Sequence, residues 1–170
     1  MCSSDLTTLC ILPGSANVIG GTGVVVKSHG RNVEKMAMRS PACLKVAFGL
    51  NVKHSHGIKA HRAPMTRMAI AAMFRQAFDE TRVYMDKRSR DPESPRDPGK
   101  DVLAAAMRRE FPVRAHCARS DDILTALRLA REYGLSLVLD HGYEAEYVLD
   151  EVHAAGVPVV LGPFFRTRSE

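Results

Sequence analysis

The chain has 170 residues, of which 45% are hydrophobic and 25% are charged. It is long and apolar enough for one ordinary domain with a buried core, and this composition excludes a wholly disordered chain. The basic residues behind the net charge of +5 are scattered among acidic ones, and aromatic residues make up only 6% with no Trp, so the charge indicates a solvated surface and not a nucleic-acid-binding one.

The sequence carries no sign of membrane insertion, secretion or paired cysteines. It has no apolar run of about 18 residues, and its first residues lack the basic, apolar and small-residue order of a signal peptide. Cys2, Cys10, Cys43 and Cys117 are far apart and form no Cys-x-x-Cys motif. We therefore expect reduced thiols in a soluble, cytoplasmic protein that binds neither membrane nor nucleic acid.

Strand and turn signals dominate the first 49 residues. Residues 7–12 are predicted to form a strand, and residues 24–27 a second one. The glycines at 20–23 indicate a tight turn and not a phosphate-binding loop, because no helix and no Lys-Ser or Lys-Thr pair follows them. Residues 32–38 are predicted to form a short helix, and residues 43–48 a third strand.

The strongest helix signal covers residues 66–87. Thr66 can cap this helix, and its apolar side chains form one stripe that is typical of core packing: Ile70, Met73, Phe74, Ala77, Thr81 and Tyr84. Residues 86–100 are rich in proline and charge, which indicates a flexible, solvated loop. Residues 101–109 are again predicted to be helical.

A β-then-α pattern repeats over the remaining residues. Strands are predicted at residues 112–116, 135–141 and 157–162, with helices between them that end at Gly134 and Gly156. Ser120 is predicted to cap the first of these helices. A period of this kind is typical of a β/α barrel or of a doubly wound parallel sheet.

Two histidines, His116 and His141, each stand at the end of a predicted strand of this pattern. Parallel strands place their carboxyl ends at one face, which is where α/β proteins carry their chemistry. Neutral imidazoles brought together there would be good ligands for Zn²⁺. A catalytic zinc site usually has three protein ligands, so the alternative also stands that each histidine only bonds a neighbouring loop carbonyl.

Several motifs closely resemble the middle of metal-dependent amidohydrolases of the imidazolonepropionase-like type. They are residues 12–21, Leu44-Lys-Val-Ala-Phe-Gly49, Pro64-Met-Thr-Arg67, residues 119–128 and residues 156–163. The resemblance covers nearly the whole chain as a single domain. It implies an α/β fold, a partial (β/α)8 TIM-type barrel of parallel strands alternating with helices, in which the first and last barrel strands are missing. It also implies metal-dependent hydrolysis of an amide or other C–N bond in a small substrate.

In the family, histidines that end the fifth and sixth barrel strands bind the metal, and they correspond to His116 and His141. Other expected groups are absent: the first-strand His-x-His and the last-strand Asp have no counterpart in this chain. Ala118 replaces a histidine of a His-Ala-His motif, and Leu50 replaces a glutamate. Lys45 is a candidate for the carboxylated lysine of some amidohydrolases, although an ordinary buried or snorkelling lysine is favoured.

A further group of histidines, His54, His56 and His61, is predicted to lie in a solvated loop. Three functional hypotheses follow from the resemblance and its departures: a metal-dependent amidohydrolase, a non-catalytic remnant, or a subunit that another chain completes. The missing groups leave no residue to assign as general base, and they predict that zinc binds this chain weakly or not at all. They also predict an inactive isolated chain, which pairs with itself or with a complementing chain.

Overall fold

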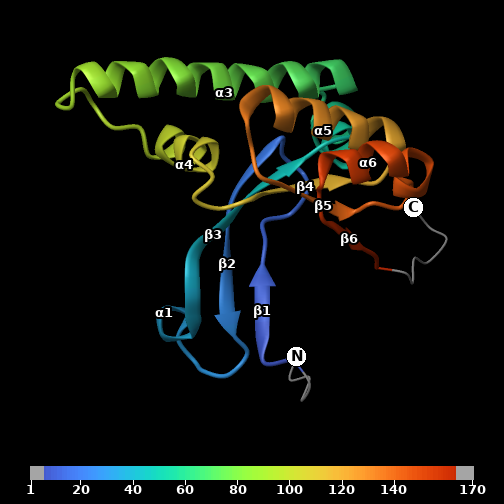
Figure 1. Ribbon diagram of the computed structural model, residues 1–170, viewed down its shortest axis with the longest axis horizontal. Coiled ribbons are helices and arrows are strands. Elements are labelled where there is room, and N and C mark those ends of the chain that lie inside the picture. The colour runs from blue at the N-terminus through green and yellow to red at the C-terminus, as the bar shows by residue number, and fades with distance from the viewer. Residues whose placement is uncertain (1–5, 164–170) are drawn as a thin grey trace.

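The structure is a computed structural model that describes residues 6–163. Its centre is a curled, mixed sheet of six strands in the order β1-β2-β3-β4-β5-β6. Helices α3, α4, α5 and α6 lie along one side of this sheet (Figure 1). Within the described residues every helix is too short or too polar to cross a lipid bilayer.

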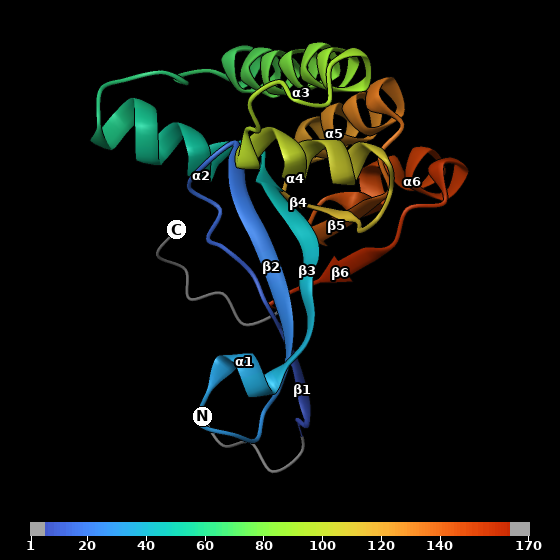
Figure 2. The same cartoon turned by 90° about the vertical axis from the view of Figure 1, so that its left-hand side faces the viewer.

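The first three strands are antiparallel, which corrects the expectation of parallel strands throughout. Strand β1 (Thr8–Ile11) pairs with β2 (Ile19–Lys27), and β2 pairs with β3 (Ala37–Ala47). Only seven residues join β1 to β2, too few for the crossover of a dozen or more that parallel neighbours require. The three strands extend away from the helices as an arm, with the short helix α1 (Val33–Met36) beside it (Figure 2).

The glycines at 20–23 lie inside β2 and do not form the predicted turn before it. The pairing register between β2 and β3 shifts between Ile19 and Gly21, as at a β-bulge. A side chain at Gly23 would overlap the sulfur of Cys43 on β3. The glycines therefore serve a bent strand that neighbouring side chains approach closely.

The long helix α3 spans Arg67–Arg90, and the Oγ1 of Thr66 caps it by accepting a hydrogen bond from the Ala69 N–H, as predicted. It continues to Arg90, and α4 already begins at Pro98 and ends at Met107. The loop is therefore shorter than the predicted 86–100. Arg88 donates hydrogen bonds to the carbonyls of Pro92 and Ser94, which holds the loop against the helix end.

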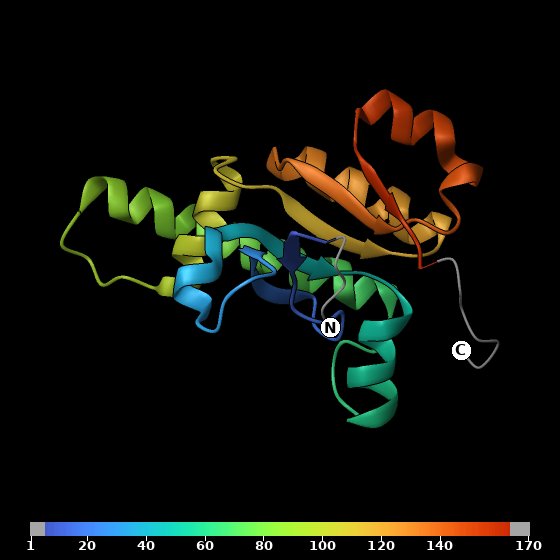
Figure 3. The ribbon, with the colours of Figure 1, turned by 90° about the horizontal axis from the view of Figure 1, so that it is seen from below.

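The C-terminal half confirms the predicted β-α alternation. Strands β4 (Val113–Cys117), β5 (Leu137–His141) and β6 (Val159–Leu161) run parallel to one another and to β3. Helix α5 (Ser120–Tyr133) joins β4 to β5, and a 3₁₀ turn (Ala145–Val148) with α6 (Leu149–Ala155) joins β5 to β6. The N-cap of α5 is Arg119 and not the predicted Ser120. Figure 3 shows α6 and α2 (Leu50–Lys53) on opposite sides of the β4–β5 pair.

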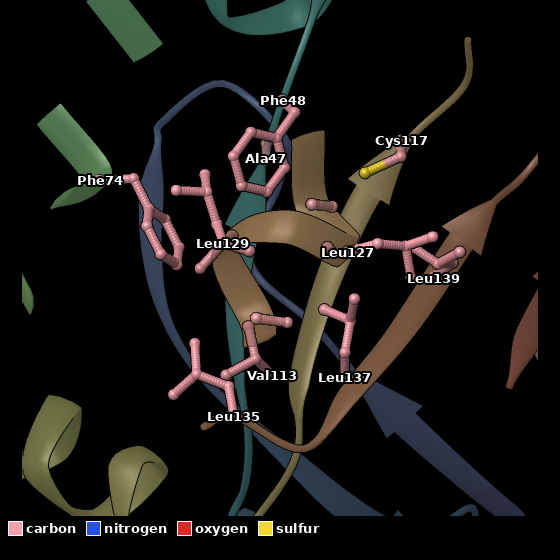
Figure 4. Packing of buried hydrophobic residues seen from close by; sticks show 14 of the residues in the cluster. Ala47, Phe48, Phe74, Val113, Cys117, Leu127, Leu129, Leu135, Leu137 and Leu139 are labelled. Carbon is pink, nitrogen blue, oxygen red and sulfur yellow. The ribbon is translucent and has the colours of Figure 1, made fainter. Parts of the chain in front are cut away.

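The main core lies between the parallel strands and the helices. Alternate residues of β4 (Val113 and Cys117) and of β5 (Leu137 and Leu139) point into it. They meet Leu127 and Leu129 of α5 and Phe74 of α3, as Figure 4 shows. Because side chains alternate along a strand, the residues between them, such as Arg114 and His116, face the other side of the sheet. This second face holds the candidate site.

Candidate functional site

A cavity of about 450 Å³ lies at the carboxyl ends of β3, β4 and β5. Both predicted histidines line it, together with residues that follow five of the six strands: Ser15, Phe48, Leu50, Asn51, Ala118, Arg119, Asp122, Tyr143 and Pro163. The carboxyl end of a parallel sheet is the expected place for a site. The spacing of the histidines along the sequence therefore predicted their meeting place correctly.

His116 lies one residue before the end of β4, on the face of the sheet that is turned away from the helices. Its Nε2 is 3.1 Å from Nδ2 of Asn51. Because an amide nitrogen only donates, Nε2 of His116 accepts this hydrogen bond, and the neutral ring carries its proton on Nδ1. Asn51 belongs to α2 (Leu50–Lys53), which begins directly after β3.

His141 reaches the same place through an unusual backbone conformation. It stands opposite Cys117 in the β4–β5 register, so simple alternation would turn its side chain toward the helices, as in Cys117. Its φ is +79°, in the left-handed region that non-glycine residues rarely adopt. The ring instead lies against His116, with centroids 4.6 Å apart and an angle of 68° between the planes. Strain of this kind is concentrated at functional sites.

A backbone hydrogen bond fixes the tautomer of His141. Its Nδ1 donates to the carbonyl oxygen of Gly162, at 2.7 Å, because a carbonyl can only accept. The neutral ring therefore keeps the lone pair of Nε2 for a ligand or a proton. A carbonyl behind the ring is the usual arrangement for a histidine that binds a metal, although it is also the bland alternative considered from the sequence.

The donor groups of the described residues do not complete a metal site. No three His, Cys, Asp or Glu side chains within residues 6–163 come together in an arrangement that could hold a metal ion. Leu50 and Ala118, which stand where the resemblance implies a glutamate and a histidine, both line the cavity. The two imidazoles thus fit part of a zinc site, and the positions of two further expected ligands carry aliphatic side chains.

Two residues of the other histidine cluster, His54 and His56, lie in helical structure, which corrects the prediction of a loop for them, whereas His61 lies in a loop as predicted. His54 and His56 belong to a π-helical segment (His54–Lys59) that continues α2, and His61 follows it. Nε2 of His56 is 3.0 Å from Oδ1 of Asn17. None of the three lines the cavity of His116 and His141.

Lys45 is buried, as the simpler interpretation of the sequence expected. Its Nζ donates to Oδ2 of Asp140 at 2.6 Å, and Arg114 donates to the other oxygen of the same carboxylate. Burial opposes ionisation of Asp140, but the hydrogen bonds from Arg114 and Lys45 outweigh it and lower its pKa. Lys45 therefore takes part in a buried ion network beneath the histidines.

Sequence reasoning did not single out Glu144, which connects two loops around the cavity. The Glu144 carboxylate, in the loop after β5, accepts hydrogen bonds from the N–H and the hydroxyl of Ser120 at the start of α5, which lowers its pKa. The Glu144 N–H donates to the Ala118 carbonyl. The loops that follow His116 and His141 are thus joined directly, by contacts between residues too far apart in sequence for a local motif to reveal.

An ion pair fixes the wall of the cavity beside β3. Arg67 donates from Nε and Nη2 to the buried carboxylate of Asp122. In the sequence, Arg67 stands out only as the last residue of the motif Pro64-Met-Thr-Arg67. The Asp122 carboxylate fills the space beside Gly49, whose φ is +83°. Gly49 precedes the helix that carries Asn51, so the ion pair helps to set the position of the His116 partner.

The chain matches two proteins of known name over most of its own length. It is 29% identical to the amidohydrolase tasK of Hapsidospora irregularis, over 90% of this chain and 17% of that protein. It is 37% identical to the crystal structure of an amidohydrolase from Thermotoga maritima, with a TM-score of 0.92, over 96% of this chain and 44% of that one. No family model matches.

The chain thus spans less than half of the length of either relative. Within that part, the fold and the sequence agree, because the superposition extends over nearly all of this chain at appreciable identity. The resemblance to amidohydrolases indicated by the motifs is therefore confirmed: in sequence and in fold, this chain is similar to part of proteins named amidohydrolases.

Proposed function

We propose that this chain forms the histidine-bearing part of a TIM-type (β/α)8 barrel, and that its chemistry is the metal-dependent hydrolysis of an amide or another C–N bond. The observation that carries the proposal is the meeting of His116 and His141 at the carboxyl ends of β4 and β5, with rings 4.6 Å apart. The strained backbone of His141 and the carbonyl behind its ring support a ligand role for this residue.

We also propose that the isolated chain does not catalyse this hydrolysis. Two imidazoles leave a divalent ion mostly solvated, whereas a catalytic site usually provides three protein ligands and an organised proton carrier. Leu50 and Ala118 cannot bind a metal or move a proton, although both line the cavity. We therefore derive no reaction step from these residues, and we expect the remaining groups to come from outside the described part of the chain.

A second candidate, a complementing subunit, rests on the edges of the sheet. Strands β1 and β6 each pair with one strand only among the described residues, and they end the sheet on either side. Leu9 and Ile11 of β1 and Leu161 of β6 are exposed. Open edges with apolar side chains favour pairing with a further strand, so a partner chain that completes the barrel could supply the missing ligands.

The test is a screen of cyclic amides and N-acyl amino acids with the purified chain, with Zn²⁺ or Mn²⁺ added. The expected result is no turnover above that of the metal alone. Metal-dependent turnover that disappears in His141→Ala would refute the inactivity and show a complete catalyst. Tight zinc binding that is unchanged after both histidines become alanine would refute their role as ligands, whatever the activity.

A further inference from the structure

A second cavity adjoins the histidine site on the face of the sheet opposite the helices. Its volume is about 340 Å³, and it shares Ser15 and His141 with the first cavity. The charged residues that line it are Lys45, Arg114 and Asp140, and most of the other walls are apolar residues of the β1–β2 connection and of β6.

The three charged side chains leave an excess of positive charge. Asp140 contacts both cations, at 2.6 Å from Nζ of Lys45 and 3.0 Å from Nε of Arg114. The side chains of Lys45 and Asp140 are almost fully buried, with exposed fractions of 4% and 5%, and that of Arg114 is partly buried, at 19%. Two cations thus share one carboxylate, and no other Asp or Glu lines this cavity among the described residues.

Hydrogen-bond donors remain on both cations. The hydrogen bonds of Arg114 within the described residues come from Nε and Nη2, and both reach the same oxygen of Asp140. A guanidinium has five N–H donors and an ammonium three, so Nη1 of Arg114 and Nζ of Lys45 have donors to spare. Both oxygens of Asp140 are already used. A buried excess charge is costly unless an opposite charge approaches it.

We propose that this second cavity binds an anion with at least two acceptor oxygens, a carboxylate or a phosphate, through Arg114 and Lys45. Arg114 is the more exposed of the two cations and faces the ligand first. Its planar guanidinium can bind two oxygens side by side, whereas Lys45 contributes a fixed point charge. The apolar walls from Leu12, Val160 and Leu161 would contact the carbon skeleton that bears the anionic group.

The position of the anion site relative to the histidines follows from strand β4. Arg114 stands two residues before His116 on the same strand and the same face, which places the two Cα atoms roughly 7 Å apart. The anion site therefore lies beside the histidine site, and its two cations are distinct from the residues proposed as metal ligands.

The test is isothermal titration of the whole chain with N-acetylglycine and with inorganic phosphate, at constant ionic strength and without added metal. Saturable binding of one anion per chain is expected, at least tenfold weaker in Arg114→Gln. The matched control is Arg75→Gln, because Arg75 also holds a carboxylate with two nitrogens but lies exposed on the helical side, with Glu132. Its affinity should equal that of the unchanged chain.

The measured affinities decide the proposal. Tighter binding of phosphate than of N-acetylglycine identifies a phosphate-bearing ligand, and the reverse identifies a carboxylate. No saturable binding, or equal affinity in Arg114→Gln, overturns it. If circular dichroism shows that Arg114→Gln is unfolded, Arg114→Lys keeps the charge without the planar fork and is expected to bind at least threefold more weakly. Unchanged affinity there also overturns the proposal. Because this test involves neither metal nor turnover, an absence of anion binding would not contradict the proposed function. Equally, an absence of hydrolysis would not contradict anion binding.

Discussion

Removal of the Asp140 charge is the sharpest test of the buried ion network. In Asp140→Asn the side chain keeps its shape, but Lys45 and Arg114 lose their shared anion while their exposed fractions are only 4% and 19%. Breaking a buried ion pair from one side costs about 3–5 kcal/mol, because it leaves an uncompensated buried charge. We expect a loss of that size in the free energy of unfolding, a large part of the total for a domain of this length.

The control is Glu110→Gln, in a pair of similar chemistry on the surface. Glu110 is 2.6 Å from Nε of Arg108, and both side chains are about half exposed, at 52% and 51%. Removing an exposed pair costs about 0–1 kcal/mol. Urea denaturation followed by circular dichroism measures both variants against the unchanged chain. A loss below about 1 kcal/mol in Asp140→Asn, similar to the control, would refute the reasoning.

The same comparison has a defined pH dependence. The pKa of Asp140 is lowered in the folded protein: burial opposes its charge, but the hydrogen bonds from Arg114 and Lys45 more than compensate. A lowered carboxyl pKa stabilises the fold fully above its unfolded value, near 4, and this contribution is lost as the pH falls through the folded pKa. The stability difference between the unchanged chain and Asp140→Asn should therefore be constant from pH 5 to 7 and shrink below about pH 4.

Three further outcomes are expected. Gly49→Ala should lower the melting temperature by more than 5 °C, because φ at this position is +83° and the added Cβ would overlap the Asp122 carboxylate. The control Gly14→Ala, whose added Cβ would meet nothing within 4 Å, should leave the melting temperature nearly unchanged. Equal melting temperatures of the two variants would contradict the close contact at Gly49. Elemental analysis after dialysis should find less than one zinc per chain, and one tightly held zinc that is lost when His116 and His141 both become alanine would mean that further ligands exist. Light scattering with size exclusion should show dimers or aggregates through the edges β1 and β6, and a monodisperse monomer at tens of micromolar would contradict this expectation.

The sequence allowed the repeating half of the fold to be predicted, because its signals are local. Helix α3 begins directly after the predicted cap, β5 and β6 lie within the predicted ranges, and β4 is shifted by one residue from the predicted 112–116. The antiparallel arm was not predicted, because nothing in the separate strand signals of the first 49 residues states how the strands pair. Only the length of the connections between them, too short for a crossover, carries that information.

The candidate site was predicted in outline only. Parallel strand ends bring His116 and His141 together, and this follows from topology alone. The turn of the His141 ring depends on one positive φ, the tautomer depends on the Gly162 carbonyl, and the partner of His116 is Asn51 from another segment. Such contacts between distant residues decide the chemistry of a site, and residue spacing cannot give them.

The hydrogen bonds of Glu144 have a consequence for how the cavity can receive a charged molecule. The first backbone N–H groups of a helix commonly attract anions, and the start of α5 lies at the cavity wall beside Arg119 and Asp122. In this chain the carboxylate of Glu144 already occupies that end of α5. The protein thus neutralises this helix terminus with its own carboxylate. An anionic ligand is therefore expected to bind near the strands and not at the start of α5.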